Sequence, residues 1–249
     1  MNAAARSVLE IAAGSFPSAL AAQRAGADRV ELCEGLDSGG TTPSYGTLAL
    51  AREHLRIPLF VLVRPRAGDF LYSPQEADVM LRDIECCVRL GCDGIVVGAL
   101  DADGQVDQPL CRQFMSAAGS LPATFHRAFD GVQDPAMALE QVIGLGFTRL
   151  LTSGGAGTAM DGADAIAARV RQAAGRIVVM PGAGITAGNV VALARATGAR
   201  EFHASAKAPR ASAMRFQAPA LQGLAPDWSE TDPERVRALR IALDAGAPV

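Results

Sequence analysis

Lysine is almost absent from this chain of 249 residues: Lys207 is the only one, and the other 22 basic residues are arginines. Such a bias is typical of the composition of a GC-rich genome. Basic residues form no stripe along the sequence, the formal net charge is −3 and the isoelectric point is about 5.6. Nucleic-acid binding relies on a basic surface, so we expect no nucleic-acid partner.

Paired cysteines of the CxxC type are also absent. A chain of this length buries enough surface to fold without disulfides, and an odd number of cysteines argues against complete pairing. We therefore expect a reducing, cytoplasmic location, with the cysteines on helices filling space rather than reacting. The five cysteines are Cys33, Cys86, Cys87, Cys92 and Cys111.

Long apolar runs are missing too. The stretch Ile177–Ala194 carries no charge, but Pro181, Gly182 and Gly184 divide it into strand, loop and helix. The N-terminus has no basic segment followed by an apolar core, so no signal peptide is expected. We predict that the chain neither spans nor enters a membrane.

Eight short apolar runs recur at intervals of about 22 to 35 residues, and a segment with helical character follows each one. This spacing predicts eight strand–helix units, which is the pattern of an α/β protein with a (β/α)8 TIM-barrel fold, in a single domain over residues 1–249. The predicted strands are Ser7–Ala13, Arg29–Glu34, Pro58–Pro65, Gly94–Leu100, Ala123–Asp130, Arg149–Gly155, Arg176–Gly182 and Glu201–Ala206.

Two segments interrupt this regular pattern. Gly35–Ser44 is a long loop of small, turn-forming residues after the second strand, where barrel loops carry function. Lys207–Glu230 is predicted as an irregular connection after the eighth strand, either a flap or a packing segment.

Strand periodicity predicts which side chains enter the barrel. Outward positions meet helices and should be apolar, so Leu9 and Ile11 pointing outward place Glu10 inside. The same reasoning sends Arg127 outward, to pair with a helix acid. Buried charges are costly unless they are paired, so the interior set is either a structural ion network or a binding or catalytic site, which we favour. The interior set is Glu10, Glu31, Cys33, Arg64, Arg66, His126 and His203.

Glycine-rich loops follow the sixth and seventh strands, where barrels often bind phosphate through backbone N–H groups. Tight turns without a ligand are the alternative. The predicted anion-binding residues are Ser153, Gly154, Gly155, Gly182 and Gly184.

Soft donors could also converge in the barrel. Cys33, His126 and His203, with Met180 nearby, are ligand types that suit Cu(I). A hard divalent ion on the interior glutamates is an equal alternative, and the positive charge of Arg64 would oppose any cation.

Five stretches of the sequence form recognisable motifs: Val30–Glu34 with Gly39–Ser44, Val63–Phe70, Phe125–Asp130, Leu151–Gly155 and Gly182–Ile185. Together they resemble the CutC family, the so-called copper homeostasis proteins. The resemblance implies a cytosolic, homo-oligomeric (β/α)8 barrel connected with copper handling. The acidic, basic and histidine positions of the family motifs fall on Glu31, Arg64, Arg66 and His126, and Cys33 is the cysteine within a matching strand.

Two functions are therefore predicted. The first is a copper-homeostasis protein that binds Cu(I) through Cys33, His126 and His203. The alternative is a TIM-barrel enzyme of lyase, isomerase or epimerase type, acting on a small anionic or phosphorylated metabolite at the carboxyl ends of the strands. In that enzyme Glu31 and His126 would act as acid and base, with Glu10, Arg64 and Arg66 beside them, and a Schiff-base role for Lys207 is conceivable.

Overall fold

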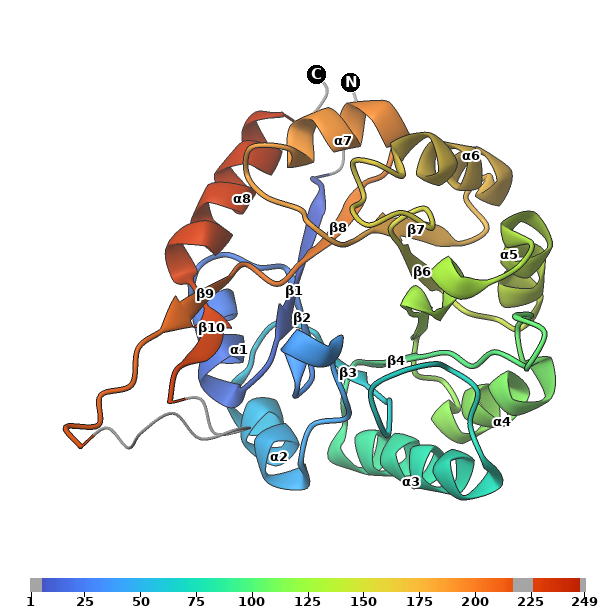
Figure 1. Ribbon diagram of the computed structural model, residues 1–249, viewed down its shortest axis with the longest axis horizontal. Coiled ribbons are helices and arrows are strands. Elements are labelled where there is room, and N and C mark those ends of the chain that lie inside the picture. Colours follow the sequence, from blue (N-terminus) through green and yellow to red (C-terminus); the bar gives the residue numbers. More distant parts are fainter. Residues whose placement is uncertain (1–5, 217–225, 247–249) are drawn as a thin grey trace.

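The computed structural model describes residues 6–216 and 226–246, and it is a barrel of parallel strands surrounded by helices (Figure 1). The strand order is β7-β6-β5-β4-β3-β2-β1-β8, and a parallel bridge between Gly182 and His203 brings the two end strands together. The prediction of a (β/α)8 barrel is confirmed. The barrel strands are β1 (Val8–Ala13), β2 (Arg29–Leu32), β3 (Leu59–Leu62), β4 (Gly94–Val97), β5 (Ala123–Phe125), β6 (Arg149–Thr152), β7 (Val178–Pro181) and β8 (Glu201–Ala204).

Among the described residues, six of the eight barrel helices follow a serine or aspartate whose side chain caps the first turn. Ser73 caps α3 and forms a capping box with Glu76, with Pro74 in the first turn. Among the described residues no helix is both long and apolar enough to cross a membrane. The helices are α1 (Phe16–Arg24), α2 (Tyr45–His54), α3 (Pro74–Leu90), α4 (Gln108–Ala118), α5 (Pro135–Gly144), α6 (Ala163–Ala173), α7 (Val190–Thr197) and α8 (Pro233–Ala245).

Several predicted strands end earlier than the sequence suggested. β3 ends at Leu62, so Arg64 and Arg66 lie in the loop that follows it. β5 ends at Phe125, and the next residues form the short 3-10 helix η2 (Arg127–Gly131). Inward and outward side chains stop alternating where a strand ends, so the direction of later side chains such as Arg66 and Arg127 cannot be predicted from strand periodicity.

The segment Lys207–Glu230 is not irregular at its two ends, contrary to the prediction. Lys207–Arg210 forms β9, which pairs in antiparallel fashion with β10 (Trp228–Thr231), while residues 217–225 lie outside the described part of the chain. Thr231 then leads into α8, which packs beside β1 and α7 (Figure 1).

Apolar side chains form two separate layers. The larger cluster fills the space between the strands and the helices, with Leu9, Ile11 and Val30 on its strand side. A smaller cluster lies inside the barrel and consists of Cys33, Phe60, Leu62 and Val96, with Leu36 beside them. Charged and polar side chains lie next to this cluster, together with apolar Leu151 and Met180.

Gly94 of β4 makes room for this inner cluster. A Cβ atom at Gly94 would lie 2.4 Å from Cε1 of Phe60, far closer than van der Waals contact. The aromatic ring fills the barrel, and two guanidinium groups stack on it, with Arg29 at 5.0 Å and Arg149 at 5.3 Å from the ring centroid. The ring of Phe60 on β3 therefore requires a glycine at position 94 on β4.

We expect the substitution Gly94→Ala to lower the free energy of unfolding by about 1–3 kcal/mol, because the ring must leave its position. Gly46→Ala is the matched control: it lies in α2 with nothing within 4 Å of its Cβ position, and it should be neutral or stabilising by up to about 1 kcal/mol. Urea unfolding of both variants measures the difference. Equal stability of the two would contradict this account of the interior.

Candidate functional site

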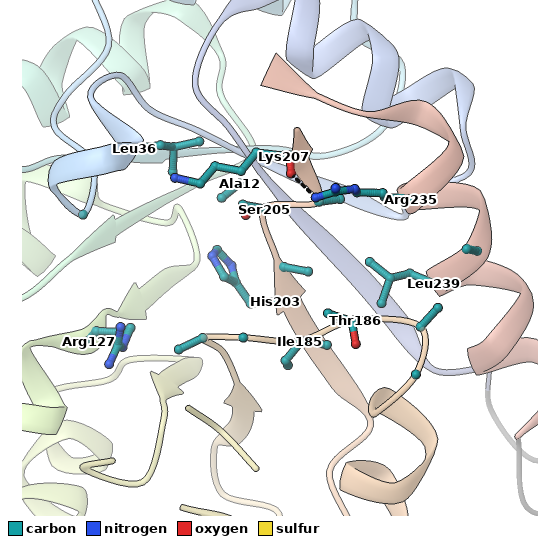
Figure 2. A pocket seen from close by; sticks show the side chains of 18 residues that line it. Ala12, Leu36, Arg127, Ile185, Thr186, His203, Ser205, Lys207, Arg235 and Leu239 are labelled. Carbon is teal, nitrogen blue, oxygen red and sulfur yellow. Dashed lines mark hydrogen bonds between the residues drawn. The ribbon is translucent and has the colours of Figure 1, made fainter. Parts of the chain in front are cut away.

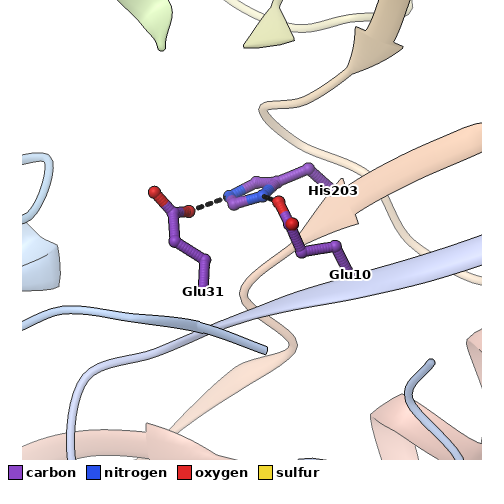
Figure 3. Close-up of side chains that lie close together, drawn as sticks. All are labelled: Glu10, Glu31 and His203. Carbon is purple, nitrogen blue, oxygen red and sulfur yellow. Dashed lines mark hydrogen bonds and ion pairs between the residues drawn. The ribbon is translucent and has the colours of Figure 1, made fainter. Parts of the chain in front are cut away.

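Two glutamates and a histidine meet inside the barrel, on three neighbouring strands. Glu10 on β1 is in register with His203 on β8, and Glu31 lies on β2 (Figure 3). Nδ1 of His203 lies 2.7 Å from Oε1 of Glu10, and Nε2 lies 3.2 Å from Oε2 of Glu31. Both ring nitrogens thus face carboxylates, which favours the doubly protonated imidazolium.

Arg29 binds Glu10 on the side away from the carboxyl ends of the strands. Nε of Arg29 forms a buried ion pair with Oε2 of Glu10, and its Nη2 lies 2.7 Å from Oε2 of Glu201, which also accepts from Arg149. Burial by itself raises the pKa of Glu10, but the charge of Arg29 and the bond to His203 outweigh it and lower that pKa to about 2. Glu10 is therefore an anion at neutral pH.

Glu31 has a different environment although it lies one strand away. Its side chain is buried and its contact with His203 is its one ion pair among the described residues. Burial raises the pKa of Glu31 to about 7; the charge of Glu10 adds to this effect, while His203 and Arg29 oppose it. Burial lowers the pKa of His203, but Glu31 and Glu10 outweigh this and raise it overall. Glu31 can thus gain or lose a proton near neutral pH.

A chamber of about 90 Å³ lies above this cluster, at the carboxyl ends of the strands. Polar side chains from β2, β8 and the loops after β3 and β5 line it, next to apolar groups. Its polar and thiol-bearing lining residues are Glu31, Cys33, Arg64, His126, Arg127 and His203.

Arg64 is a buried cation at the wall of this chamber. Its Nη1 donates to the backbone carbonyls of Ser38 and Gly40, at 3.3 and 3.0 Å, and its Nη2 donates to that of Gly68 at 2.7 Å. The guanidinium also stacks on Phe70 at 4.9 Å. None of the described carboxylates forms an ion pair with it, so its positive charge is neutralised only by dipoles. Such a charge favours an anion in the chamber.

His126 closes the chamber on the β5 side. Its Nδ1 accepts a hydrogen bond from the amide of Ala128 at 3.2 Å, as the N-terminal cap of η2. Burial, followed by the charge of Arg64, lowers its pKa to about 3, so the ring is neutral at physiological pH. It therefore lacks the basicity expected of the acid–base partner that the sequence predicted.

A second and larger pocket, of about 640 Å³, adjoins the chamber (Figure 2). The two share Ala12, Leu36, Gly39, Arg127 and His203 in their walls. The larger pocket lies between the loops after β7 and β8 and one side of α8, and Lys207 and Arg235 line it without any carboxylate among the lining residues. Lys207 itself pairs with Asp37, across the mouth, which leaves its Schiff-base role without support from the geometry.

Two predicted site residues, Arg66 and Cys33, do not offer the chemistry expected of them. Arg66 is on the surface, in ion pairs with Glu76 at 2.6 Å and Asp69 at 2.9 Å, because β3 ends before it. The thiol of Cys33 contacts the carbonyl of Ala13 at 3.6 Å, and burial, with the nearby glutamates, raises its pKa well above the usual value.

The predicted anion loop after β6 already holds an anion of the protein itself. The carboxylate of Asp130 accepts from the amides of Ser153 and Gly155, at 3.0 and 3.2 Å, while Gly154 donates to the hydroxyl of Thr152. These amides are therefore not open to an external anion. Gly182 donates to the carbonyl of Thr152, and of the five predicted residues only Gly184 lines the large pocket.

Arg127 lies at the mouth of both pockets, not against an outer helix. It binds Asp130 at 2.7 Å and the hydroxyl of Ser153 at 3.0 Å. The sequence argument missed it because η2 breaks the strand alternation. It also missed Arg29, although Arg29 shares the parity of Glu31 and could have been found by extending that pattern by one step.

The proposed Cu(I) ligands do not gather into one site. Among the described residues, the group that brings three potential ligand atoms within 4.8 Å of one another is Glu10, Glu31 and His203, and it includes neither Cys33 nor His126. Oxygen-rich groups of this kind suit harder ions than Cu(I).

The structure is a (β/α)8 barrel with a pocket at the carboxyl ends of its strands, the face on which proteins of this fold bind their ligands. Comparison with known proteins narrows this class. The model of the CutC family matches residues 7–208, and the chain belongs to that family.

Proteins from a bacterium and from human are similar to this chain over most of its length. A family protein CutC from Xylella fastidiosa strain Temecula1 is 58% identical over 239 residues, which cover 96% of this chain and 90% of that protein. The human copper homeostasis protein cutC homolog is 50% identical over 210 residues, covering 84% and 77%. A crystal structure of the copper homeostasis protein CutC from Streptococcus agalactiae has a TM-score of 0.77 at 34% identity, and covers 80% of this chain and 98% of that one.

The central ion network predicts a specific loss of stability. Glu10→Gln should lower the free energy of unfolding at pH 7 by about 3 kcal/mol, because Arg29 and His203 lose their common carboxylate. A carboxyl group whose pKa is lowered in the folded state stabilises the fold at pH values above its pKa in the unfolded chain. This stabilisation is lost as the pH falls toward 2. The difference should therefore shrink to about half near pH 3.

Denaturant unfolding at pH 7 and pH 3 measures this difference. Asp78→Asn is the control, because it breaks an exposed pair with Arg82 and should cost less than about 1 kcal/mol. A loss of stability in Glu10→Gln that does not change with pH would show that the charge of Glu10 is not responsible.

Proposed function

We propose that the protein is an enzyme that performs acid–base chemistry on a small anionic metabolite, of lyase, isomerase or epimerase type. The observation that carries this proposal is the buried, carboxylate-free cation of Arg64 in the same chamber as Glu31, whose pKa is about 7. An anionic group of the substrate would neutralise Arg64, and Glu31 would exchange a proton with the bound molecule.

The cluster below the chamber supports the proton transfer. His203 bridges Glu31 to Glu10, and Glu10 is fixed by Arg29, so the imidazolium is held beside Glu31 whichever protonation state Glu31 adopts. Two neighbouring carboxyl groups with separated pKa values are a common arrangement in acid–base catalysis. In this proposal Glu31 is the catalytic group, and Glu10 is a positioning residue.

The larger pocket supports a substrate that extends beyond the chamber. Its volume of about 640 Å³ is enough for a metabolite, and its charged lining is basic. A phosphorylated or otherwise anionic tail there would lie near Lys207 and Arg235 (Figure 2).

A screen of phosphorylated and carboxylated metabolites by thermal shift tests the proposal. A ligand at about 100 times its dissociation constant stabilises a protein by about 2.7 kcal/mol, which raises the Tm of a chain of this length by about 5–10 °C. We expect such a shift for wild type and for Arg66→Ala, whose arginine is on the surface. Arg64→Ala should lose it, and Arg64→Lys, which keeps the charge, should retain part.

Glu31→Gln completes this test, since it should still bind the ligand but lose turnover of it. If no anion in the screen stabilises wild type more than it stabilises Arg64→Ala, the proposal is contradicted. Circular dichroism establishes that each variant is folded before its ligand response is compared.

Copper binding is the second candidate, and the copper homeostasis names of the relatives suggest it. The feature that favours it is the close grouping of Glu10, Glu31 and His203. Oxygen and imidazole donors suit Cu(II) better than Cu(I), and the thiol of Cys33 lies outside the group with a raised pKa that opposes thiolate formation.

An anaerobic Cu(I) titration of wild type and Cys33→Ser checks this candidate. We expect both proteins to bind Cu(I) equally and no more tightly than micromolar, because no thiolate site is assembled. Submicromolar binding that disappears in Cys33→Ser would favour the copper function instead. His54→Ala serves as the control, since His54 is an exposed histidine at the end of the outer helix α2.

We also propose a reducing, cytoplasmic location, which the five free cysteines support, and a homo-oligomeric state, which follows from the family resemblance.

A further inference from the structure

We infer that the reaction is proton transfer next to a carbonyl group, and that His126 binds the carbonyl oxygen through its Nε2–H. This inference rests on the proposed function and adds the class of substrate, which is a small carbonyl compound that carries an anionic group. Negative charge develops on the carbonyl oxygen during such a reaction, and a fixed donor stabilises it.

The backbone fixes the tautomer of His126. Since Nδ1 accepts the amide proton of Ala128, a neutral ring must carry its proton on Nε2. The hydrogen bond belongs to the cap of η2, so the short helix that follows β5 sets both the ring orientation and its donor.

The packing of the ring limits the groups that Nε2 can meet. A Cβ atom at Gly98 would lie 2.9 Å from Nδ1 and 3.0 Å from Cε1, so that edge of the ring lies against the residue that follows β4. His126 lines the chamber, and its Nε2 is buried without a hydrogen-bond partner among the described residues, a state that costs about 1–3 kcal/mol. A ligand oxygen that reaches Nε2 would supply the missing partner.

The charge state suits a donor rather than an acid. Burial and the neighbouring Arg64 keep the ring neutral, with a pKa of about 3. A neutral imidazole gives a hydrogen bond to a developing oxyanion without losing its proton. A carboxylate base combined with a neutral imidazole donor is an established arrangement for enolisation.

The step balances with groups that the chamber already contains. Glu31, as a carboxylate, removes a proton from the carbon beside the carbonyl group. The electron pair of the broken C–H bond forms a C=C bond, and the carbonyl π pair moves to the oxygen, which accepts the Nε2–H hydrogen bond of His126. Return of the proton from Glu31 to the same carbon completes an exchange, while Arg64 binds the anionic group. If that carbon carries a hydroxyl group, its hydroxyl proton passes to the enolate oxygen and the Glu31 proton adds to the former carbonyl carbon, which completes an isomerisation.

Nitrogen-15 NMR of histidine-labelled wild type tests the tautomer without any substitution. We expect His126 to remain neutral and protonated on Nε2 from pH 5.5 to 8.5. Protonation on Nδ1, or titration of the ring within this range, would overturn the inference. The titratable and charged groups that face the chamber with His126 are Glu31, Cys33, Arg64, Arg127 and His203.

Glycolohydroxamate, a planar mimic of an enediolate, provides the binding test against glycolate, with EDTA present to exclude metal chelation. Wild type should bind the hydroxamate at least tenfold more tightly and shift the Nε2–H proton signal downfield. His126→Asn keeps an acceptor for Ala128 but has no Nε2–H, so it should lose the preference. His126→Gln, which retains an N–H near Nε2, should keep part of it.

The outcomes separate this inference from the proposed function. If wild type and both variants bind the two probes with the same affinity, the anion site stands and the role of His126 is wrong. If wild type binds neither these probes nor any other anion, both proposals fail. Denaturant unfolding of the two variants shows whether a loss of preference reflects the donor or the fold.

Discussion

The interior of this barrel depends on the buried ion pair between Glu10 and Arg29. Glu10 lies on β1, between β2 and β8, so a single carboxylate can bind Arg29 on one side and His203 on the other. Arg29 also reaches Glu201 through its Nη2, and Glu201 binds Arg149 as well, so two arginines balance two glutamates at the base of the barrel. Glu31, which lies nearer the carboxyl ends of the strands, forms no ion pair with an arginine among the described residues. Burial without an arginine partner of its own therefore leaves Glu31 with a pKa of about 7.

Loop conformation turns this interior into a pocket. Gly40 has a φ of +87°, and a Cβ there would lie 2.7 Å from Cδ2 of Leu62, so only glycine allows the loop to pass so close to β3. The carbonyl of Gly40 then accepts from Arg64. The guanidinium is thus held by backbone oxygens, which leave its charge available, whereas a carboxylate would have cancelled it. Rigid backbone dipoles around a buried cation form a binding site for an anion before any ligand arrives.

The sequence was sufficient for the barrel and for much of its interior. Period-two alternation holds within strands, so it placed Glu10, Glu31 and His203 inside, where the structure has them. It failed where strands end. Arg66 follows the end of β3 and turns to Glu76, and Arg127 lies in η2, where alternation has no meaning. Asp130 filling the loop after β6 is a contact between residues 23 apart, and no local pattern predicts it. Likewise, sequence cannot give the burial that separates the pKa values of two glutamates on adjacent strands.

Electrostatics also bears on which ligand the chamber favours. A cation that reached the Glu10, Glu31 and His203 group would need a lone pair from His203, whose two nitrogens both face carboxylates, and it would compete with Arg29 for Glu10. On its way it would pass Arg64 and Arg127. An anion meets the opposite situation, because Arg64 has no carboxylate to release and His126 has a donor to offer. Arg64 and Arg127 therefore favour an anion over a metal ion at the chamber wall, and at the Glu10, Glu31 and His203 group a metal ion must displace existing ion pairs.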